Sequence, residues 1–374
     1  MFKQIRTAAT VAMLTVATLA VAVEGNQAHP DTYVVQKGDT LWDISARFLK
    51  KPWLWPEIWQ ANPQVKNPHL IYPGDVLSLA YLDRISAQPG PRTEAPINAI
   101  PLAQVEPFLK DLSVVDSFQH LPYVVGLEDN RLRASAGQLA YVKGLDSAAV
   151  GQRYAVVRPT VRYALPQLNA DLDARGKETA GAGNLWASYV PTSERTEALG
   201  YELAKVNVGT VTRVAAGTAG ATALMLEDSG REVRAGDRLV PVQAQPYDLQ
   251  FIPHAPSAQA LASDARVLAV ADMFTAGGRR DVIAISAGSR EGVDNGTVFS
   301  IWRDGSHIND RVAQNQTSRA DDAFNAGNGR VSLPDEYAAH AMVFRTFDKV
   351  SYALVMSGSK PARVGYNTKH PDAQ

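Results

Sequence analysis

A stretch near the N-terminus, residues 31–81, constrains the fold more than any other part of the chain, because turn residues separate its short apolar segments in a fixed order. Residues 32–36 contain the pair Val34-Val35 and predict a strand. The Gly38-Asp39-Thr40 sequence that follows predicts a tight turn and offers an N-cap for a helix. Apolar residues then recur at the spacing of a helix with one buried face: Leu41, Ile44 and Phe48.

The second half of this stretch predicts a second helix and a second strand. Pro52 ends the first helix, and Pro56 suits the first turn of the next one, which Asn62-Pro63 stops. Residues 72–75, with the sequence Tyr-Pro-Gly-Asp, form a turn that leads into a strand over residues 76–80. The stretch therefore predicts a small βααβ fold. Its two strands lie side by side, and its two Gly-Asp turns meet at one edge.

The order of these elements, together with the turns KGDT and IYPGD, resembles a LysM domain, the module that binds the N-acetylglucosamine-rich glycan strands of peptidoglycan and chitin. In that family, the edge where the two turns meet is a shallow groove for the sugar chain. The resemblance implies that peptidoglycan glycan strands are the ligand. The implied walls of the groove are Gly38, Asp39, Thr40 and Leu41 on one side, and Asn67, His69, Leu70, Ile71 and Tyr72 on the other.

The aromatic residues of this stretch have two possible roles. Aromatic faces could pack on sugar rings, or they could form the core of a small domain. We expect Trp59 to belong to the core, and Ile71 has the same alternative to a place in the groove wall. The role of three other tryptophans stays open, and the KKPWLWP segment that holds two of them is longer than the shortest LysM pattern: Trp42, Trp53 and Trp55.

The first residues indicate export from the cytoplasm. Lys3 and Arg6 precede a small-residue apolar run, and Ala20-Val21-Ala22 is typical of a signal-peptide cleavage site. We therefore expect residues 1–22 to be a signal peptide, with a second possible cut after Ala28 and an uncleaved membrane anchor as the alternative. The expected location is the periplasm, in association with the cell wall.

Composition narrows the class of protein further. The chain has no cysteine, which rules out both disulfides and lipid attachment through an N-terminal cysteine. The formal net charge of −1 gives no overall basic character, so nucleic acid is not an expected partner. A hydrophobic content of 45% is typical of a globular chain that buries a core.

Beyond residue 81 the sequence predicts a linker and a mainly β region. Residues 83–101 are rich in proline and polar residues, as in a semi-extended tether. Residues 104–118 have helical apolar spacing, and from about residue 123 short apolar runs alternate with glycine-containing turns. We expect an α+β protein with a LysM domain at 31–81, a first β-rich half with a short N-terminal helix at 102–245, and a second β-rich half at 246–370.

The two β-rich halves show a weak internal repeat. Gly151 and Gly296 each lie seven residues before an arginine, with a predicted strand between. The turns EVRAGDRLVP and PARVGYNTKHP also fall at matching places, and each half carries a polar insertion, at 160–198 and 304–337. The alternative is two unrelated β regions that share common turn chemistry.

This overall order is similar to that of the type IV pilus secretin-associated protein family: a signal peptide, one LysM domain, a proline-rich linker and a paired β region with VRAGDRLVP-type turns. In that family the C-terminal part resembles a flagellar outer-membrane-ring protein and associates with the secretin channel. The resemblance implies a protein that anchors an outer-membrane secretin complex to the cell wall, with a possible ring-like oligomer around that partner.

Motifs for catalysis are absent from the sequence. The lack of cysteine excludes a cysteine nucleophile, and none of the seven histidines lies in a zinc-binding pattern. Glu202 and Asp228 are lone carboxylates, which in strand-rich sequence are usually surface charges. We therefore expect a non-catalytic protein without cofactor or metal. The alternative is a cell-wall hydrolase, or a regulator of one, with an unrecognised site.

Overall fold

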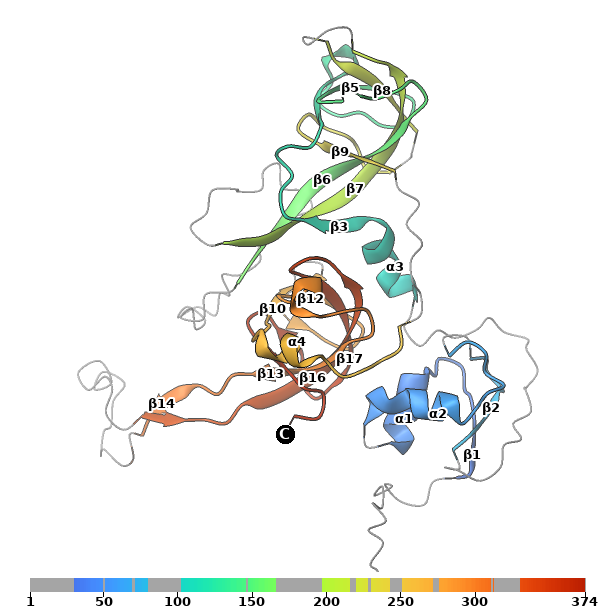
Figure 1. The fold of residues 1–374 in the computed structure, drawn as a ribbon, viewed down its shortest axis with the longest axis vertical. Helices are drawn as coiled ribbons and strands as arrows, with labels where there is room; N and C mark the ends of the chain where they lie inside the picture. The colour runs from blue at the N-terminus through green and yellow to red at the C-terminus, as the bar shows by residue number, and fades with distance from the viewer. Residues whose placement is uncertain are drawn as a thin grey trace, which may run out of the picture.

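The computed structural model describes residues 30–49, 51–68, 71–79, 102–145, 147–165, 197–215, 220–227, 230–242, 251–271, 276–310, 312 and 330–373. The expected signal peptide (1–22) and linker (83–101) lie outside the described residues. Along the chain, a small N-terminal unit is followed by two β structures (Figure 1). No helix of the described residues is long and apolar enough to cross a membrane.

The N-terminal unit, residues 30–79, has the predicted order of elements. It consists of β1 (Thr32–Val34), α1 (Leu41–Phe48), the short 3-10 helix η1 (Pro52–Leu54), α2 (Trp55–Gln60) and β2 (Val76–Ser78). The two strands pair in antiparallel fashion, with Thr32 opposite Ser78. The βααβ prediction is therefore confirmed, and η1 occupies the part of the KKPWLWP segment that makes it long.

Tryptophan side chains supply much of the core of this unit. Trp42 and Trp55, whose roles the sequence left open, are only 1% and 0% exposed and lie with Ile44 in the core. Trp59 is half-buried at the edge of the core, and its indole N–H donates to the carbonyl of Val65 at 2.6 Å. Fully burying such side chains contributes roughly 2–3 kcal/mol each, which suits a unit this small.

The next part of the chain closes into an antiparallel barrel. Its strands are β4 (Tyr123–Leu127), β5 (Leu139–Lys143), β6 (Arg153–Ala164), β7 (Ala198–Arg213), β8 (Thr222–Leu226) and β9 (Arg238–Pro241). Around the barrel they follow the order β4-β5-β8-β7-β6-β9, and β9 returns to β4. The 3-10 helix η2 (Glu128–Asn130) follows β4. We call this the first barrel.

The C-terminal part forms a second barrel, preceded by α4 (Ala258–Ala262). Its strands are β10 (Val267–Val270), β12 (Val282–Ile285), β13 (Val298–Arg303), β16 (Glu336–Thr346), β17 (Ser351–Gly358) and β19 (Asn367–Lys369). They follow the order β10-β12-β17-β16-β13-β19, and a bridge between Arg266 and Asn367 returns β19 to β10. If the strands of each barrel are numbered one to six along the chain, their order around both barrels is therefore 1-2-5-4-3-6. Shorter elements are β11 (Ala276–Gly277), β18 (Ala362–Arg363), η4 (Ser289–Glu291) and the hairpin of β14 (His307–Asn309) with β15 (Arg330–Ser332).

The repeat extends to individual hydrogen bonds. The N–H of Gly151 donates to Val211 at 2.8 Å, and the N–H of Gly296 donates to Val343 at 2.7 Å, each from the start of the third barrel strand to the fourth. The glycines of the two turns noted in the sequence match in the same way: Gly236 donates to Val124 and Gly365 donates to Val267, both at 2.8 Å. All four glycines have positive φ, a conformation that glycine adopts without steric cost. The two barrels thus share both their strand order and the hydrogen bonds of these turns.

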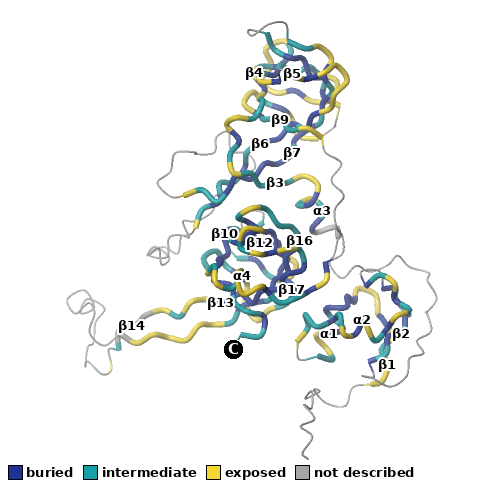
Figure 2. Tube along the Cα trace, viewed as in Figure 1, coloured by how far each residue is buried: buried dark blue, intermediate teal, exposed yellow. Residues whose placement is uncertain are grey.

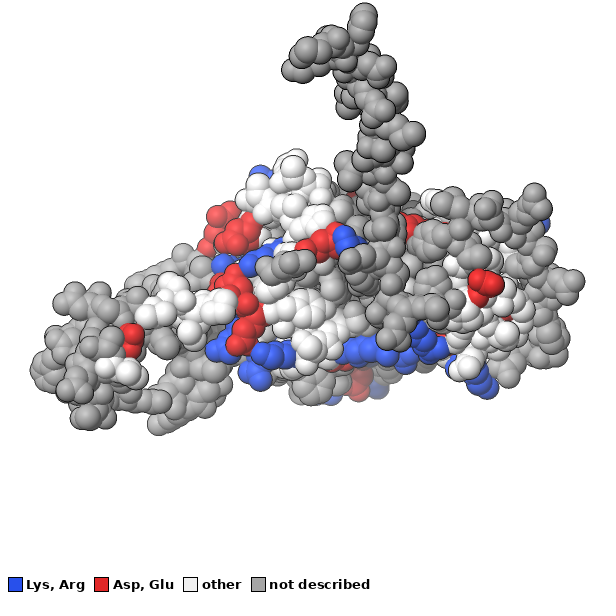
Figure 3. Space-filling view, turned by 90° about the horizontal axis from the view of Figure 1, so that it is seen from below, with Lys and Arg blue, Asp and Glu red and all other residues white. Residues whose placement is uncertain are grey.

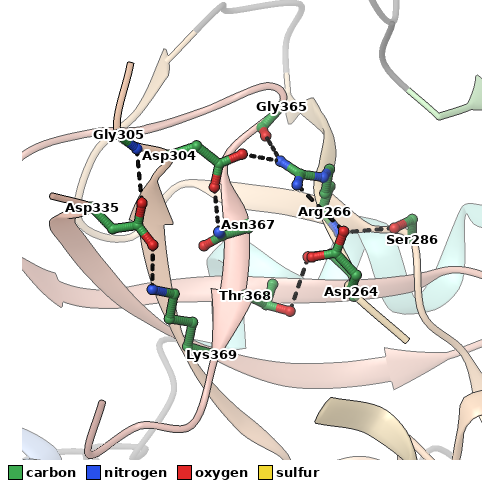
Figure 4. A network of polar contacts seen from close by, with 11 residues as sticks. Asp264, Arg266, Ser286, Asp304, Gly305, Asp335, Gly365, Asn367, Thr368 and Lys369 are labelled. Atoms are coloured by element: carbon green, nitrogen blue, oxygen red, sulfur yellow. Dashed lines mark hydrogen bonds and ion pairs between the residues drawn. The ribbon is translucent and has the colours of Figure 1, made fainter. Parts of the chain in front are cut away.

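A network of charged side chains ties the β14–β15 hairpin to the second barrel (Figure 4). On one side of the hairpin, Asp304 accepts from Arg266 at 2.6 Å. On the other side, Asp335 accepts from the N–H of Gly305 at 2.8 Å and from Lys369 at 2.5 Å. These bonds, the one from Lys369 first, lower the pKa of the Asp335 carboxyl. The hairpin, which reaches outward from the barrel in Figure 1, is therefore fixed at its base.

The two barrels are joined by α3 (Leu102–Lys110) and β3 (Leu112–Val115). The predicted helix over 104–118 thus ends early, because the chain turns into a strand that pairs with β7. Arg345 of the second barrel donates to the carbonyls of Phe108 and Leu109 at the end of α3 and of Leu112 at the start of β3. The ring of Phe108 packs edge-on against Tyr352, with 5.8 Å between the ring centres. In Figure 2 the strands of both barrels carry buried residues (dark blue) along their length.

Glu202 lies at this joint, and its expected position on the surface is wrong. The side chain is 6% exposed, and its carboxylate accepts from Thr160 and Tyr163 of β6 and from Tyr352 of β17, each at 2.7 Å. Burial, together with the charge of Glu202, raises the pKa of both tyrosine hydroxyls well above 10. Three hydroxyl donors offset the cost of burying the carboxylate, so Glu202 is a structural residue. Asp228 lies outside the described residues.

Candidate functional site

The two Gly-Asp turns of the N-terminal unit have the same construction. In the first, the N–H of Asp39 donates to Gln36 at 3.1 Å, and the Asp39 carboxylate accepts from the N–H of Gln36 at 2.9 Å. In the second, Asp75 and Tyr72 form the same reciprocal pair, at 3.0 and 3.1 Å. In both, the residue before the aspartate is glycine at φ +90°, a left-handed conformation that disfavours other residues.

Val35 holds the two turns next to each other. Its N–H donates to the carbonyl of Asp75, and its carbonyl accepts from the N–H of Gly74, both at 2.8 Å. Residues 36–39 and 72–75 therefore flank one edge of the unit, as the sequence predicted. This arrangement brings the backbone groups of both turns to a single face.

On the first wall, Asp39 is 4% exposed and its carboxylate is occupied. It accepts from the hydroxyl of Tyr33 at 2.6 Å, from the N–H of Gln36 and from the guanidinium of Arg47 at 2.8 Å. Burial, followed by the hydrogen bond to Asp39, raises the pKa of Tyr33. Asp39 thus shapes the turn, while Gly38 beside it is exposed.

The hydroxyl of Thr40 caps α1. It accepts from the N–H of Asp43 at 3.1 Å and donates to the Asp43 carboxylate at 2.9 Å. Thr40 is 8% exposed, and Leu41 after it is 1% exposed. The sequence carries a signal for this pair, because an acidic residue three positions after a threonine is the pattern of a helix N-terminus.

On the second wall, Ile71 is fully buried, whereas Asn67 and Tyr72 are half-buried. His69 and Leu70 lie outside the described residues. The predicted site residues that the structure describes therefore divide into two groups. Asp39, Thr40, Leu41 and Ile71 shape the edge from within, and Gly38, Asn67 and Tyr72 reach its surface.

The described residues of this edge supply hydrogen-bonding backbone groups and one aromatic ring. The edge offers peptide N–H and C=O groups from two turns, held in place by buried side chains, and the half-buried ring of Tyr72. Such groups can pair with an amide of a ligand. In the described part of the chain, no cluster of three or more His, Asp or Glu side chains could hold a metal ion. Basic and acidic side chains share the face in Figure 3, in keeping with the near-neutral charge.

Comparison with known proteins agrees with this geometry. Residues 33–80 match the LysM domain family. The chain is also 34% identical over 64 residues to "Uncharacterized protein YqbP" of Bacillus subtilis (strain 168), a similarity that covers 14% of this chain and 29% of that protein. The chain thus spans under a third of the length of the relative it matches. Residues 33–80 thus form a LysM domain, and a domain of this family suggests peptidoglycan binding.

Proposed function

We propose that the LysM domain binds glycan strands of peptidoglycan along the edge formed by residues 36–41 and 67–75, and that the two barrels attach this domain to an outer-membrane secretin complex. The glycan part rests on one observation: Val35 bonds to both Gly74 and Asp75 and so sets the two turns side by side. The secretin part rests on the overall order of domains in the sequence.

The burial of the wall residues suggests how the sugar is recognised. The side chains of Asp39 and Thr40 already make several hydrogen bonds inside the domain. The acetamido groups of N-acetylglucosamine would therefore meet backbone groups of the turns. Tyr72, which is half-buried, would pack on a sugar ring. A small, partly hydrated contact of this kind gives modest affinity, which several copies around a ring would strengthen.

The stiffness of the barrel pair supports an anchoring role. The joint combines a buried carboxylate with three hydroxyl donors, and Arg345 adds hydrogen bonds to the end of α3 and the start of β3. A load on one barrel would therefore be transmitted to the other rather than lost in a flexible hinge. Residues 83–101 would connect this body to the LysM domain, and residues 1–22 would direct export to the periplasm.

The test of glycan binding is a pull-down with insoluble peptidoglycan. The full chain without residues 1–22 should sediment with the peptidoglycan, and a chain that begins near Glu94 should stay in solution. Full binding by the shorter chain would contradict the proposal. A zymogram with the same preparations should show no clearing, and clearing would favour the hydrolase alternative instead.

The test of the secretin role is complementation of a deletion strain. The form without residues 31–81 should still co-purify with the secretin after cross-linking but should leave it poorly anchored, with defective emergence of pili. If the protein does not co-purify with a secretin and its loss leaves piliation intact, the barrels serve another envelope complex.

A further inference from the structure

The LysM domain contacts the second barrel at two separate points. At one point, Asp43 of α1 forms an ion pair with Arg279, in the turn between β11 and β12. At the other, Asp372 near the C-terminus accepts from Lys51 at 2.5 Å and from the indole N–H of Trp53 at 3.2 Å. The signs of charge are opposite at the two points. The pairing is therefore satisfied in one orientation of the domain only.

Asp372 belongs to a segment that the second barrel holds firmly. The carbonyl of His370 accepts from Ser300 at 2.6 Å, and the carbonyl of Pro371 accepts from Nε2 of His340 at 2.9 Å. Because a carbonyl only accepts, Nε2 carries the proton, and Nδ1 of His340 accepts from the hydroxyl of Tyr337 at 2.6 Å. Asp372 is thus presented from a fixed backbone rather than from a loose end.

Arg279 is presented in a comparable way. The turn that carries it is closed by Asp281, whose N–H donates to the carbonyl of Gly278 at 3.1 Å and whose carboxylate accepts from the N–H of Gly278 at 2.7 Å. The next residue, Arg280, has φ +74° and donates from its N–H to Val355 at 2.7 Å. The backbone on both sides of Arg279 is therefore fixed.

The LysM side of the contact comes from the segment that lengthens this domain. Lys51 and Trp53 both lie in KKPWLWP, and Trp53 is half-buried, whereas Trp42 and Trp55 are fully buried in the core. Trp42 and Trp55 therefore lie in the interior of the domain, whereas Trp53 packs against the core from its edge and keeps its indole N–H available at the surface. Its indole N–H contributes to the contact with Asp372.

The contact is accessible to solvent and ions. The side chains of Lys51 and Arg279 are 47% and 53% exposed, and those of Asp372 and Asp43 are 28% and 17% exposed. Exposed ion pairs are individually weak, and dissolved salt screens them. The screening length falls to about 3 Å in 1 M salt. The contact can therefore open without unfolding either part.

We propose that these two ion pairs form a latch that docks the LysM domain on the second barrel, with Lys51 and Trp53 as the docking element and the C-terminal segment around Asp372 as its receptor. Closed, the latch holds the domain against the barrel, with Arg279 next to the Asp43 that supports Thr40. Open, it leaves the domain on the linker. The latch does not depend on the glycan proposal, because the turns are held together by Val35 inside the LysM domain.

The absence of native cysteine allows a direct test by spin-label distance measurement. Labels at Lys66→Cys and Ser359→Cys occupy exposed positions on the LysM domain and the second barrel, away from the ion pairs. In the full chain without residues 1–22, we expect one narrow distance distribution at about 50 mM salt. We expect a broad distribution at about 1 M salt, where the ion pairs are screened.

Variants then identify the residues responsible. Asp372→Lys should give the broad distribution at low salt, and Lys51→Asp combined with Asp372→Lys should restore the narrow one, which no loss of folding could produce. Asp116→Lys, at an exposed position between β3 and β4, is the matched control and should leave the distribution narrow. A broad distribution in the unchanged chain at low salt, or a narrow one in Asp372→Lys, would overturn the latch.

Discussion

Tyr352 of the second barrel donates a hydrogen bond to Glu202 of the first barrel at 2.7 Å, and this contact lies in the buried joint between them. The carboxylate has two further donors, Thr160 and Tyr163, both from its own barrel. Tyr352 is thus the donor through which the second barrel takes part in solvating this charge. The association of the barrels and the burial of Glu202 depend on each other.

Tyr352→Phe should destabilise the protein by roughly 1.5–3 kcal/mol, the range for a hydrogen bond to a charged group. The reason is that Glu202 stays buried with one donor fewer. The measurement is urea unfolding followed by tryptophan fluorescence. Tyr123→Phe is the matched control, because Tyr123 is 39% exposed and water can reach its hydroxyl. Equal effects of the two substitutions would show that the Glu202 contact adds nothing to stability.

Ile71→Ala should lower the stability of the LysM domain by roughly 2–5 kcal/mol, because the Ile71 side chain is 0% exposed and its truncation leaves a cavity. Thr40→Ala removes a helix N-cap and should cost about 1 kcal/mol. Thermal melts and peptidoglycan pull-downs of both variants separate structural from binding effects. If Ile71→Ala weakens glycan binding while its melting temperature is unchanged, Ile71 is a groove residue and not a core residue.

Much of the LysM fold could be predicted from sequence because its signals are local. A glycine before an aspartate, a threonine before an apolar helix face and a proline in a first turn each act within a few residues. The internal repeat of the two β-rich halves was also visible in the sequence, because its glycines, which have positive φ, keep their spacing from the predicted strands. These features require no knowledge of which segments meet in space.

The rest depended on contacts between distant segments. The sequence suggested a surface position for Glu202 because Tyr352, one of its hydrogen-bond donors, lies 150 positions away along the chain. The helix expected up to Phe118 ends at Lys110 because β7 offers a pairing edge to the next residues. The sequence left the roles of Trp42 and Trp53 open, and only the packing of α1 and the position of Asp372 distinguish core from contact.

Arg280→Gly should stabilise the second barrel. Arg280 has φ +74° at the position where the first barrel has Gly137 at φ +82°, and the two N–H groups bond equivalent strands, to Val355 and Leu226. A non-glycine residue in this conformation costs about 1–2 kcal/mol, part of which is offset because glycine makes the unfolded chain more flexible. A rise in melting temperature is expected.

The converse substitutions test the same reasoning at two matched glycines. A Cβ at Gly296 would lie 2.2 Å from the carbonyl oxygen of Ile252, whereas a Cβ at Gly365 would meet nothing within 4 Å. Gly296→Ala should therefore destabilise far more than Gly365→Ala, which incurs the backbone strain alone. If the two variants melt together, steric contact at the repeat position is not what requires Gly296.

Stability of the second barrel should decrease as the pH falls below about 6.5, through His340. Burial, partly opposed by the hydrogen bond to Pro371 and the charge of Asp372, lowers the pKa of His340 below 6.5. The unfolded chain then binds a proton at a higher pH than the folded chain. The free energy of unfolding is therefore constant above pH 6.5 on this account and falls between 6.5 and the pKa of the folded state.

His340→Gln keeps an N–H donor for Pro371 but cannot titrate, so the drop in melting temperature between pH 7.5 and pH 5.5 should be smaller than in the unchanged chain. His120→Gln, at an exposed position, is the control and should leave that drop as it is.

Because His340 also holds the segment that presents Asp372, the spin-label distance should broaden over the same pH range in the unchanged chain and not in His340→Gln. An identical pH dependence in all three proteins would mean that His340 is protonated equally in the folded and unfolded states, which its hydrogen bonds to Tyr337 and Pro371 argue against.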